Sequence, residues 1–412
     1  MLQPFVGRTV ADVYQLSAAA MHLPRYPQYR VDETVSARYR YYYNRSARYC
    51  SCQSARFVLF GGTVSTLVED GVYDPTHDLS SWWNGYYREQ FGAQVGEVIK
   101  YSGAQGYRAY LSANPEPRVI TPHPYDDTHI PRERFYLSAP DVVARLNDKG
   151  EMRALSRRAV PYQVYDAASF AADHWRDEWE LPFVVKLTTP SGGGDGVCIC
   201  RDLNDVAAAK LRFAGQTVKL ERYLDNIRRN INVNLCVTPT GAVSLIGGSL
   251  QRVESDARYA GNLIDLAWQP EDAVREICVE IADNAAQMGW HGVCGLDLIE
   301  TDDGDYHFID PNFRLNGSTP FYLMRDYFAT HFATPLLSTG YYTYAGDPVT
   351  FLDEFRSEIE AKRLAPIGIY YDPCEDDLTR VYAAVTSDGD LDEYAAFEAT
   401  LSAKRLRAGI YL

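Results

Sequence analysis

The sequence predicts an α/β fold with α+β parts, arranged in more than one domain. The chain has 412 residues, a length that suggests about two to three domains. Of these residues 46% are hydrophobic, which is enough for sizeable cores. Short apolar runs bounded by glycine turns occur together with one long amphipathic helical pattern, a combination typical of mixed α/β proteins.

The first 150 residues are irregular in composition but still predict some elements. The run RFVLFGG at 56–62 predicts a buried strand that ends in a glycine turn. Residues 113–133 are rich in proline and predict a connection or a functional loop, and Ala139–Leu146 predicts a helix. Tyrosine and arginine crowd residues 38–56. We interpret them as a buried aromatic layer with solvated arginines rather than a nucleic-acid surface, because the net charge is −15.

The pattern becomes more regular after residue 180. One helix is expected at Asp202–Phe213, with Leu203, Val206 and Leu211 on its apolar face. A second is expected at Pro270–Gln287 and ends at Gly289. The expected strands are 181–189, 197–201, 216–225, 229–237, 242–253, 293–300 and 305–310.

The last two of these strands carry the strongest chemical signal. They flank the turn TDDG and predict a hairpin, with Asp297 in the first strand and Asp310 and Asn312 at the end of the second. Antiparallel pairing brings such residues within a few Å of each other across the ladder. Two carboxylates and an amide oxygen on a rigid sheet suit Mg²⁺, which completes its octahedron with waters and phosphate oxygens. The alternative is a strand edge whose acids face water.

A glycine-rich turn, SGGGDG at 191–196, follows the strand that contains Lys186. Its free backbone N–H groups suit a phosphate, although a plain hairpin loop explains the glycines about as well. Lys186, a charge in an apolar strand, favours the phosphate interpretation. Downstream, Glu221–Asp225 forms a strand-to-loop boundary whose backbone suits a purine edge, with Asp225 or Asn232 as a partner for ribose hydroxyls.

Other candidate sites are weaker. The pairs Cys50 with Cys52 and Cys198 with Cys200 have one-residue gaps, which favours core thiols over a metal site. A second cluster, His123, Asp126, Asp127 and His129, is fixed on no common face. No apolar run approaches the roughly 20 residues of a membrane span, and no secretory signal is recognised. We therefore expect a cytoplasmic protein without nucleic-acid or membrane partners.

A lysine strand, a glycine flap, a glutamate hinge, an aspartate strand and Asp-x-Asn followed by arginine occur in one order, and this order resembles the ATP-grasp superfamily. The resemblance covers about residues 145–330. The 13-residue step from Asp297 to Asp310, with Asn312 after it, resembles the metal motif of the superfamily, where glutamate is more usual than Asp310.

The resemblance implies roles for individual residues. The implied metal ligands are Asp297, Asp310 and Asn312. The implied catalytic residues are Arg314, Lys186 and Gln251. The implied nucleotide-binding residues are Lys149, Lys186, Ser191, Gly192, Gly193, Gly194, Gly196, Glu221, Tyr223, Asp225 and Asn232, although Asn232 stands where many members have an acid. Gly261 and Asn262 resemble a segment near the acceptor pocket of the amino-acid ligases.

The resemblance also implies the domains and the reaction. A Rossmann-like N-terminal domain would span 1–145, a small α+β lid domain 146–225, and a larger α+β domain with the metal site and a C-terminal extension 226–412. The cofactors would be ATP and Mg²⁺, with Mn²⁺ as an alternative. A small-molecule carboxylate, similar to an amino acid, would become an acyl phosphate and then react with an amine, giving ADP and phosphate. Relatives include peptide ligases of bacterial secondary metabolism, and a homodimer is expected from them.

Two other functions fit the same motifs. One is an ATP-grasp kinase with a hydroxyl acceptor, and the other is a nucleotide-binding protein without turnover. The intact lysines and metal residues argue against loss of turnover. A dinucleotide oxidoreductase is not favoured, because no G-x-G-x-x-G enters a helix.

Overall fold

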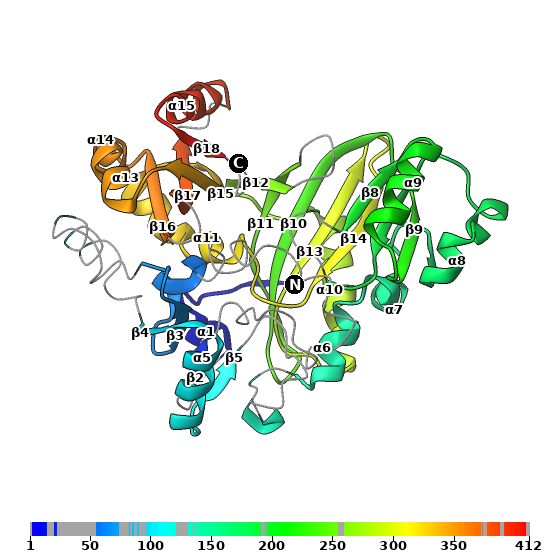
Figure 1. The fold of residues 1–412 in the computed structure, drawn as a ribbon, viewed down its shortest axis with the longest axis horizontal. Helices are drawn as coiled ribbons and strands as arrows, with labels where there is room; N and C mark the ends of the chain where they lie inside the picture. Colours follow the sequence, from blue (N-terminus) through cyan, green and yellow to red (C-terminus); the bar gives the residue numbers. More distant parts are fainter. Residues whose placement is uncertain are drawn as a thin grey trace.

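Three β-sheets organise the part of the chain that the computed structural model describes (Figure 1). The described residues are 2–14, 20–22, 55–73, 82, 85, 89, 96–120, 131–134, 136, 138–190, 194, 196–253, 259–371, 373, 377–387 and 391–408. The Cys50–Cys52 pair, the His123–His129 cluster and most of the tyrosine- and arginine-rich stretch lie outside these residues.

The N-terminal sheet is parallel and has the strand order β4-β3-β2-β5. Its strands are β2 (Ala20–His22), β3 (Ser65–Glu69), β4 (Val98–Tyr101) and β5 (Arg118–Ile120). Helix α5 (Gly103–Ala113) connects β4 to β5, and α1 (Val10–Tyr14) precedes the sheet. In chain order this is third-second-first-fourth, the arrangement of a Rossmann-like half. The α/β prediction for this part is confirmed.

The strand predicted at 56–62 is wrong. Residues Ala55–Phe60 form a 3₁₀ helix, η1, and the strand begins only at Ser65. Helix η1 packs closely on β16 (Leu364–Tyr370), since a β-carbon on Gly368 would lie 2.4 Å from the Ala55 carbonyl oxygen. A short apolar run does not distinguish a buried helical turn from a buried strand, because both exclude water on every side.

A second four-stranded sheet is antiparallel, with the order β6-β9-β7-β8. Its strands are β6 (Tyr162–Tyr165), β7 (Phe183–Leu187), β8 (Val197–Cys200) and β9 (Val218–Arg222), covered by α8 (Ala167–Ala171) and α9 (Leu203–Arg212). The strands predicted around 181–189, 197–201 and 216–225 are therefore present. Cys198 and Cys200 are free thiols on β8.

Helix α9 has a different buried face from the predicted one. Asp202 caps its N-terminus, as the position of the helix predicts. However, Leu203 is 52% exposed and Leu211 is 82% exposed, whereas Val206 and Ala209 are buried. The small residue Ala209 lies against the sheet because it lets the helix approach closely. A prediction of the buried face from the large apolar residues alone was therefore wrong.

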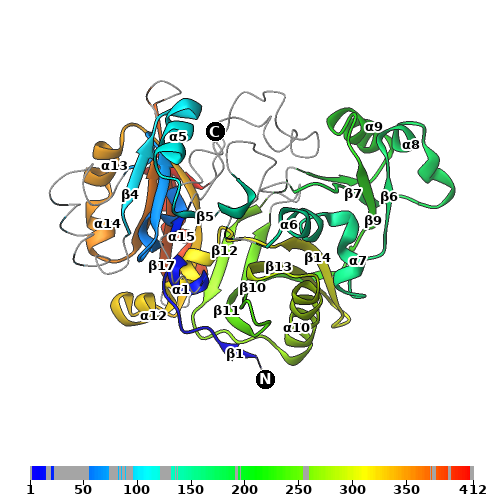
Figure 2. The same ribbon diagram turned by 90° about the horizontal axis from the view of Figure 1, so that it is seen from below.

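The largest described sheet has ten strands, in the order β14-β13-β10-β11-β12-β15-β17-β16, with β1 on β11 and β18 on β15. Its other strands are β1 (Gln3–Pro4), β10 (Ile227–Val237), β11 (Val243–Val253), β12 (Tyr259–Asp265), β13 (Gly292–Thr301), β14 (Tyr306–Asn312), β15 (Leu336–Ala345), β17 (Leu378–Ser387) and β18 (Leu406–Ala408). Helix α10 (Asp272–Gln287) covers one face of the β10–β13 half (Figure 2), and its predicted apolar face is buried. Gly289 follows with φ +91°, as a helix-ending glycine should.

The remaining helices join or flank the sheets. They are α6 (Pro140–Leu146), the 3₁₀ turns η2 (Arg132–Arg134), η3 (Lys149–Glu151) and η4 (His174–Asp177), α7 (Met152–Leu155), α11 (Thr319–Leu323), α12 (Arg325–Tyr327), the π-helical turn Phe328–Phe332, α13 (Pro348–Glu354), α14 (Arg356–Glu360) and α15 (Leu391–Ala403). Among the described residues, no helix is both long enough and apolar enough to cross a bilayer.

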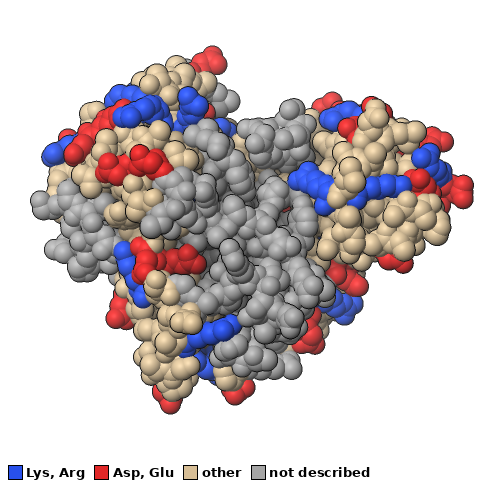
Figure 3. Space-filling view, viewed as in Figure 1, with Lys and Arg blue, Asp and Glu red and all other residues tan. Residues whose placement is uncertain are grey.

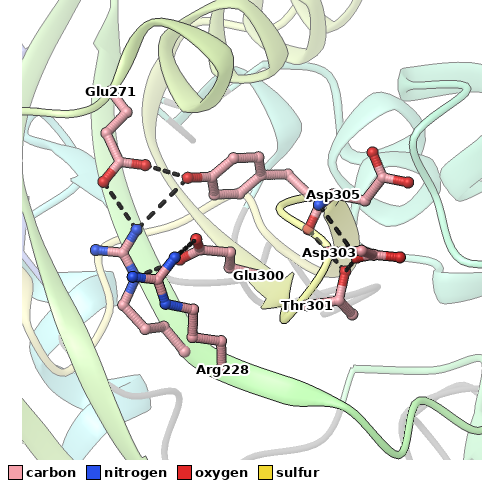
Figure 4. A network of polar contacts seen from close by, with 8 residues as sticks. Arg228, Glu271, Glu300, Thr301, Asp303 and Asp305 are labelled. Carbon is pink, nitrogen blue, oxygen red and sulfur yellow. Dashed lines mark hydrogen bonds and ion pairs between the residues drawn. The ribbon is translucent and has the colours of Figure 1, made fainter.

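An ion-pair network fixes the far end of the hairpin (Figure 4). Glu300 on β13 is buried and pairs with Arg228, at 2.9 Å, and with Arg229 on β10. Arg229 also pairs with Glu271, the residue before α10, at 2.8 Å. The Tyr306 hydroxyl donates to Glu271 as well. The network thus ties β10, β13, β14 and α10 together, so that the hairpin presents its other end in a fixed register.

Charges of both signs are interspersed on the described surface of α13–α15 and of the β6–β9 sheet with its helices (Figure 3). On the C-terminal side several are paired, as Arg356 is with Glu360 and Arg405 with Glu354.

Candidate functional site

The predicted metal residues lie together on the β13–β14 hairpin. Asp297 is directly opposite Asp310, and Asn312 is opposite Gly295, two residue pairs further along the ladder. The Asn312 amide donates to Asp297 Oδ2 at 3.2 Å. Asp297 and Asn312 are each only 9% exposed. The predicted convergence is therefore present, and the role of the three residues as metal ligands stays a prediction.

The charges at this hairpin favour a bound cation. Burial, and then the charge of Asp310, raises the pKa of Asp297 to about 6. In the described part of the chain no further His, Cys, Asp or Glu joins the two carboxylates to form a group of three. A donor set of two carboxylates and one amide leaves coordination positions for water and phosphate oxygens, which fits Mg²⁺.

A buried lysine–glutamate–lysine cluster lies beside the hairpin. Lys186 on β7 donates to Glu221 Oε1 at 2.7 Å and to the Ile309 carbonyl on β14 at 3.3 Å. Lys219 on β9 lies 2.6 Å from Glu221 Oε2. Burial alone would raise the pKa of Glu221, but Lys186 and Lys219 together lower it. The cluster holds more positive than negative charge, so it suits an anionic ligand.

Lys219 was missed by the sequence analysis. It precedes Glu221 by two residues, and alternate residues of a strand share a face, so this spacing was the available signal. Its Nζ is fully buried and lies 4.7 Å from the centre of the Tyr162 ring. Burial lowers the pKa of Lys219 from 10.5 to about 8, even though Glu221 opposes the shift.

This shift predicts a pH dependence of stability. Between pH 8 and 10.5 the folded chain holds Lys219 neutral while the unfolded chain still protonates it. The free energy of unfolding contributed by this group should therefore rise with pH in that window, by at most about 1.4 kcal/mol per unit. Denaturant unfolding should show this rise as the difference in free energy of unfolding between the wild type and Lys219→Met. A surface control, Lys210→Met, should keep it, and an unchanged slope in Lys219→Met would contradict the assignment.

Lys149 and Arg314 approach the hairpin from the preceding segment and the following loop. Lys149 is buried, and its Nζ lies 2.9 Å from Asp310 Oδ1. The Arg314 guanidinium donates to Asn147 Oδ1 at 3.2 Å, and the same oxygen accepts from the Phe313 N–H at 3.0 Å. Asn147, at the end of α6, thus positions Arg314. Sequence reasoning missed it, because its partner is 167 positions away.

The predicted nucleotide-binding residues are only partly joined to this cluster. Tyr223 is half-buried and Asp225 is exposed, and no contact in the described structure connects either to the lysines. Gly194, with φ +87°, accepts from the Val197 N–H at 3.0 Å, which forms the turn between β7 and β8. Gly196 accepts from the Leu187 N–H. Ser191, Gly192 and Gly193 lie outside the described residues.

Asn232 takes a different place from the one expected for a ribose partner. Its amide donates to Asp297 Oδ1 at 2.6 Å, and its Oδ1 accepts from Asn234 and Ser318 and lies 3.1 Å from the Tyr322 hydroxyl oxygen. Both ends of the side chain are therefore engaged inside the protein. This geometry favours a role in orienting Asp297. Gln251, predicted as catalytic, also hydrogen-bonds Asp297 and lowers its pKa.

The polar network continues across the sheet away from the hairpin. The Tyr322 hydroxyl donates to Ser249 at 2.6 Å, Ser249 donates to Asn262 at 3.1 Å, and the Asn262 amide donates to Tyr259 at 2.5 Å. These residues lie on α11, β11 and β12. A connected row of donors and acceptors thus leads from Asp297 to the region where Gly261 and Asn262 were expected near an acceptor.

A glycine makes room for this network. A β-carbon on Gly247 would lie 2.8 Å from the Tyr322 ring. Gly247→Ala should therefore displace Tyr322 from Asn232 and Ser249 and lower the free energy of unfolding by about 1–3 kcal/mol. Denaturant titration checks this. Gly106→Ala is the matched control, since its β-carbon meets nothing closer than 3.8 Å. Equal stability of the two variants would show that the ring moves freely.

Comparisons with known proteins agree with this geometry. Residues 161–312 match the family model described as L-aspartate--L-methionine ligase, ATP grasp. The matched stretch contains Lys186, Glu221 and the three hairpin residues, whereas Lys149 and Arg314 lie just outside it.

Among solved structures, the fold is similar to that of N5-carboxyaminoimidazole ribonucleotide synthetase in complex with ADP. The TM-score is 0.55 at 12% identity, over 82% of this chain and 90% of that chain. Biotin carboxylase of Campylobacter jejuni, in a β-γ-ATP complex, gives 0.53 at 13%, over 84% and 86%. The biotin carboxylase domain dimer of Hydrogenobacter thermophilus 2-oxoglutarate carboxylase, with MgADP, ADP and bicarbonate, gives 0.52 at 12%, over 84% and 85%.

The fold and the family match agree on one class, since residues 161–312 match a family of ATP-grasp ligases and the solved structures share the overall fold. Within that class, residues 161–312 are similar to the ATP-grasp domain of L-aspartate–L-methionine ligase.

Proposed function

We propose that the chain joins an amino-acid-like carboxylate to an amine at the expense of ATP. A carboxylate oxygen attacks the γ-phosphorus, the bond to the β–γ bridging oxygen breaks, and ADP leaves. The amine then attacks the acyl carbon, phosphate leaves, and the amine loses its proton to give an amide. The observation that carries the proposal is the buried hairpin of Asp297, Asp310 and Asn312 beside Lys149 and Lys186.

Each residue has a role in this proposal. Mg²⁺, or Mn²⁺ in its place, would be held by Asp297, Asp310 and Asn312 and would neutralise phosphate charge. Lys149, Lys186 and Arg314 would contact the transferred phosphoryl group, where fixed cations stabilise developing charge. Glu221, Tyr223 and Asp225 would take the base and sugar, and Ser191–Gly196 would cover the phosphates. Gln251 and Asn232 would orient Asp297.

The family match indicates where to look for substrates. L-Aspartate and L-methionine are named by the matched family and are the first pair to test. The domain boundaries 1–145, 146–225 and 226–412 stay predictions. A homodimer, as in the Hydrogenobacter thermophilus structure, and a cytoplasmic location are part of the same proposal.

A screen of L-amino acid pairs tests the proposal. ADP and phosphate release are measured with Mg-ATP, and products are identified by mass. An amide that appears with stoichiometric ADP supports it. AMP with pyrophosphate, or a phosphorylated product, would replace it with an adenylating or kinase reaction. Light scattering of the same sample gives the oligomeric state.

A further inference from the structure

A buried tyrosine hydroxyl in the largest sheet has no hydrogen-bond partner among the described residues. Tyr382 on β17 is 2% exposed, and its Oη neither donates nor accepts there. An unsatisfied buried hydroxyl destabilises a fold by about 1–3 kcal/mol. Such a group therefore needs an explanation, and a ligand that completes its bonding is one.

Arg56 of helix η1 brings a cation to the same place. Its guanidinium carbon lies 5.1 Å from the centre of the Tyr341 ring and 5.7 Å from that of Tyr382. Tyr341 and Tyr382 are opposite each other on β15 and β17, with ring centres 4.6 Å apart. The Arg56 Nε donates to the Tyr341 hydroxyl. Two rings and this hydrogen bond thus hold the guanidinium in one orientation, which stacking on aromatic faces favours.

Gly317 lies close to both polar groups. A β-carbon on Gly317 would lie 3.1 Å from Arg56 Nη1 and 3.3 Å from Tyr382 Oη. Both groups therefore face the same side of Gly317, and no side chain of residue 317 stands between them. We call Arg56 and Tyr382 the Arg56–Tyr382 pair.

The pair lies at the end of the metal motif. Gly317 follows Asn316, whose amide nitrogen would collide with a β-carbon on Gly295 at 1.8 Å. Gly295 is opposite Asn312 on the hairpin. Helix η1, drawn in blue in Figure 1, contacts β16 and α11, so Arg56 reaches this region from the N-terminal part of the chain.

We infer that the Arg56–Tyr382 pair binds a carboxylate of a substrate, other than the carboxylate that is phosphorylated. This inference rests on the proposed function and narrows its substrates to those with a free carboxylate next to the reacting groups. A guanidinium offers two parallel N–H donors to a carboxylate, and the tyrosine hydroxyl adds a third. The carboxylate belongs either to the amine substrate or to the activated acid.

The test measures binding by calorimetry with the full chain, Mg²⁺ and a non-hydrolysable ATP analogue, so that turnover is not needed. Each of the twenty standard L-amino acids is compared with its α-carboxamide. We expect Arg56→Met to weaken binding of the best acid about 10- to 100-fold and Tyr382→Phe about 3- to 10-fold. Binding of the matching amide should be weak in the wild type and unchanged in both variants.

The substrate that binds more weakly as its amide shows whether the bound carboxylate belongs to the amine substrate or to the activated acid. If the amino acid that supplies the amine loses affinity as its amide, the pair binds the acceptor. If the activated acid has a second carboxylate and loses affinity when only that second, non-reacting carboxylate is converted to an amide, the pair binds the donor. Either result supports the inference.

Three results would overturn it: no amino acid binds, acid and amide bind equally, or Arg56→Met weakens both alike. Arg363→Met is the control, since the Arg363 guanidinium also stacks on a ring, that of Phe397 at 3.8 Å, but pairs with Glu393 on the surface. Binding that follows the expectation without any ADP release in the wild type would instead sink the proposed function and leave the inference standing.

Discussion

Asp310→Asn should lower ATP-dependent turnover by about 10²- to 10³-fold or more, the scale seen when one charge-stabilising group is lost from an active site. The substitution keeps the shape of the side chain but removes one of the two carboxylate charges on the hairpin. The Mg²⁺ requirement should rise in parallel, because an amide is a weaker ligand for a hard cation. Lys149, buried and 2.9 Å from Asp310, also loses its acidic partner.

ADP release at increasing Mg²⁺ concentration checks this expectation. Asp302→Asn is the matched control, because Asp302 is an exposed aspartate at the turn of the same hairpin. Asp310→Glu should retain substantial activity, since a longer carboxylate still reaches the cation. Full turnover in Asp310→Asn would show that the metal site lies elsewhere.

The hairpin was predictable from sequence because its turn and strands follow from local information. The turn at TDDG and the alternation of apolar residues bring Asp297 close to Asp310, although a register irregularity between Asp297 and Leu298 sets their direct pairing. The same holds for α10, whose spacing and terminal glycine set its buried face.

The neighbours of the hairpin were not predictable in this way. Asn147 and Lys219 act through partners that only the tertiary fold brings near, Arg314 for the first and the Tyr162 ring for the second. Asn232 has a side chain that could hydrogen-bond ribose hydroxyls, yet the register between β10 and β13 puts it opposite Asp297. These contacts depend on the register between strands that are far apart in the sequence. That register cannot be derived from a single sequence.

The order of the strands in the largest sheet was also not predictable, because it depends on pairing between distant parts of the chain. The strands of the tail beyond residue 335 insert beside β12, and β1 pairs with β11 some 240 positions later. Helix η1, taken for a strand, contributes Arg56 to a pair whose other member, Tyr382, is in that tail. The substrate-facing half of the site thus arises from the parts of the chain with the weakest local signals.

Lys186→Met should weaken ATP binding by about 10- to 100-fold, the loss expected for a charge-assisted hydrogen bond, and should reduce turnover further. Lys186 contacts both Glu221 and the carbonyl of Ile309 next to Asp310, so it links the proposed base-binding strand to the metal hairpin. Stability should change less than activity, because Glu221 keeps Lys219 as its ion-pair partner after the substitution.

Calorimetric titration with an ATP analogue, together with denaturant unfolding, separates these two effects. Lys210→Met, in which a lysine of the same small sheet domain loses its pair with Asp173, should leave nucleotide affinity unchanged. A Lys186→Met protein that unfolds easily but binds the analogue normally would assign Lys186 to folding. If the Lys186→Met protein is stable but binds the analogue weakly, the Lys186 ammonium group contacts the phosphates in the wild type. Only a lost contact with the ligand would then explain the lower affinity.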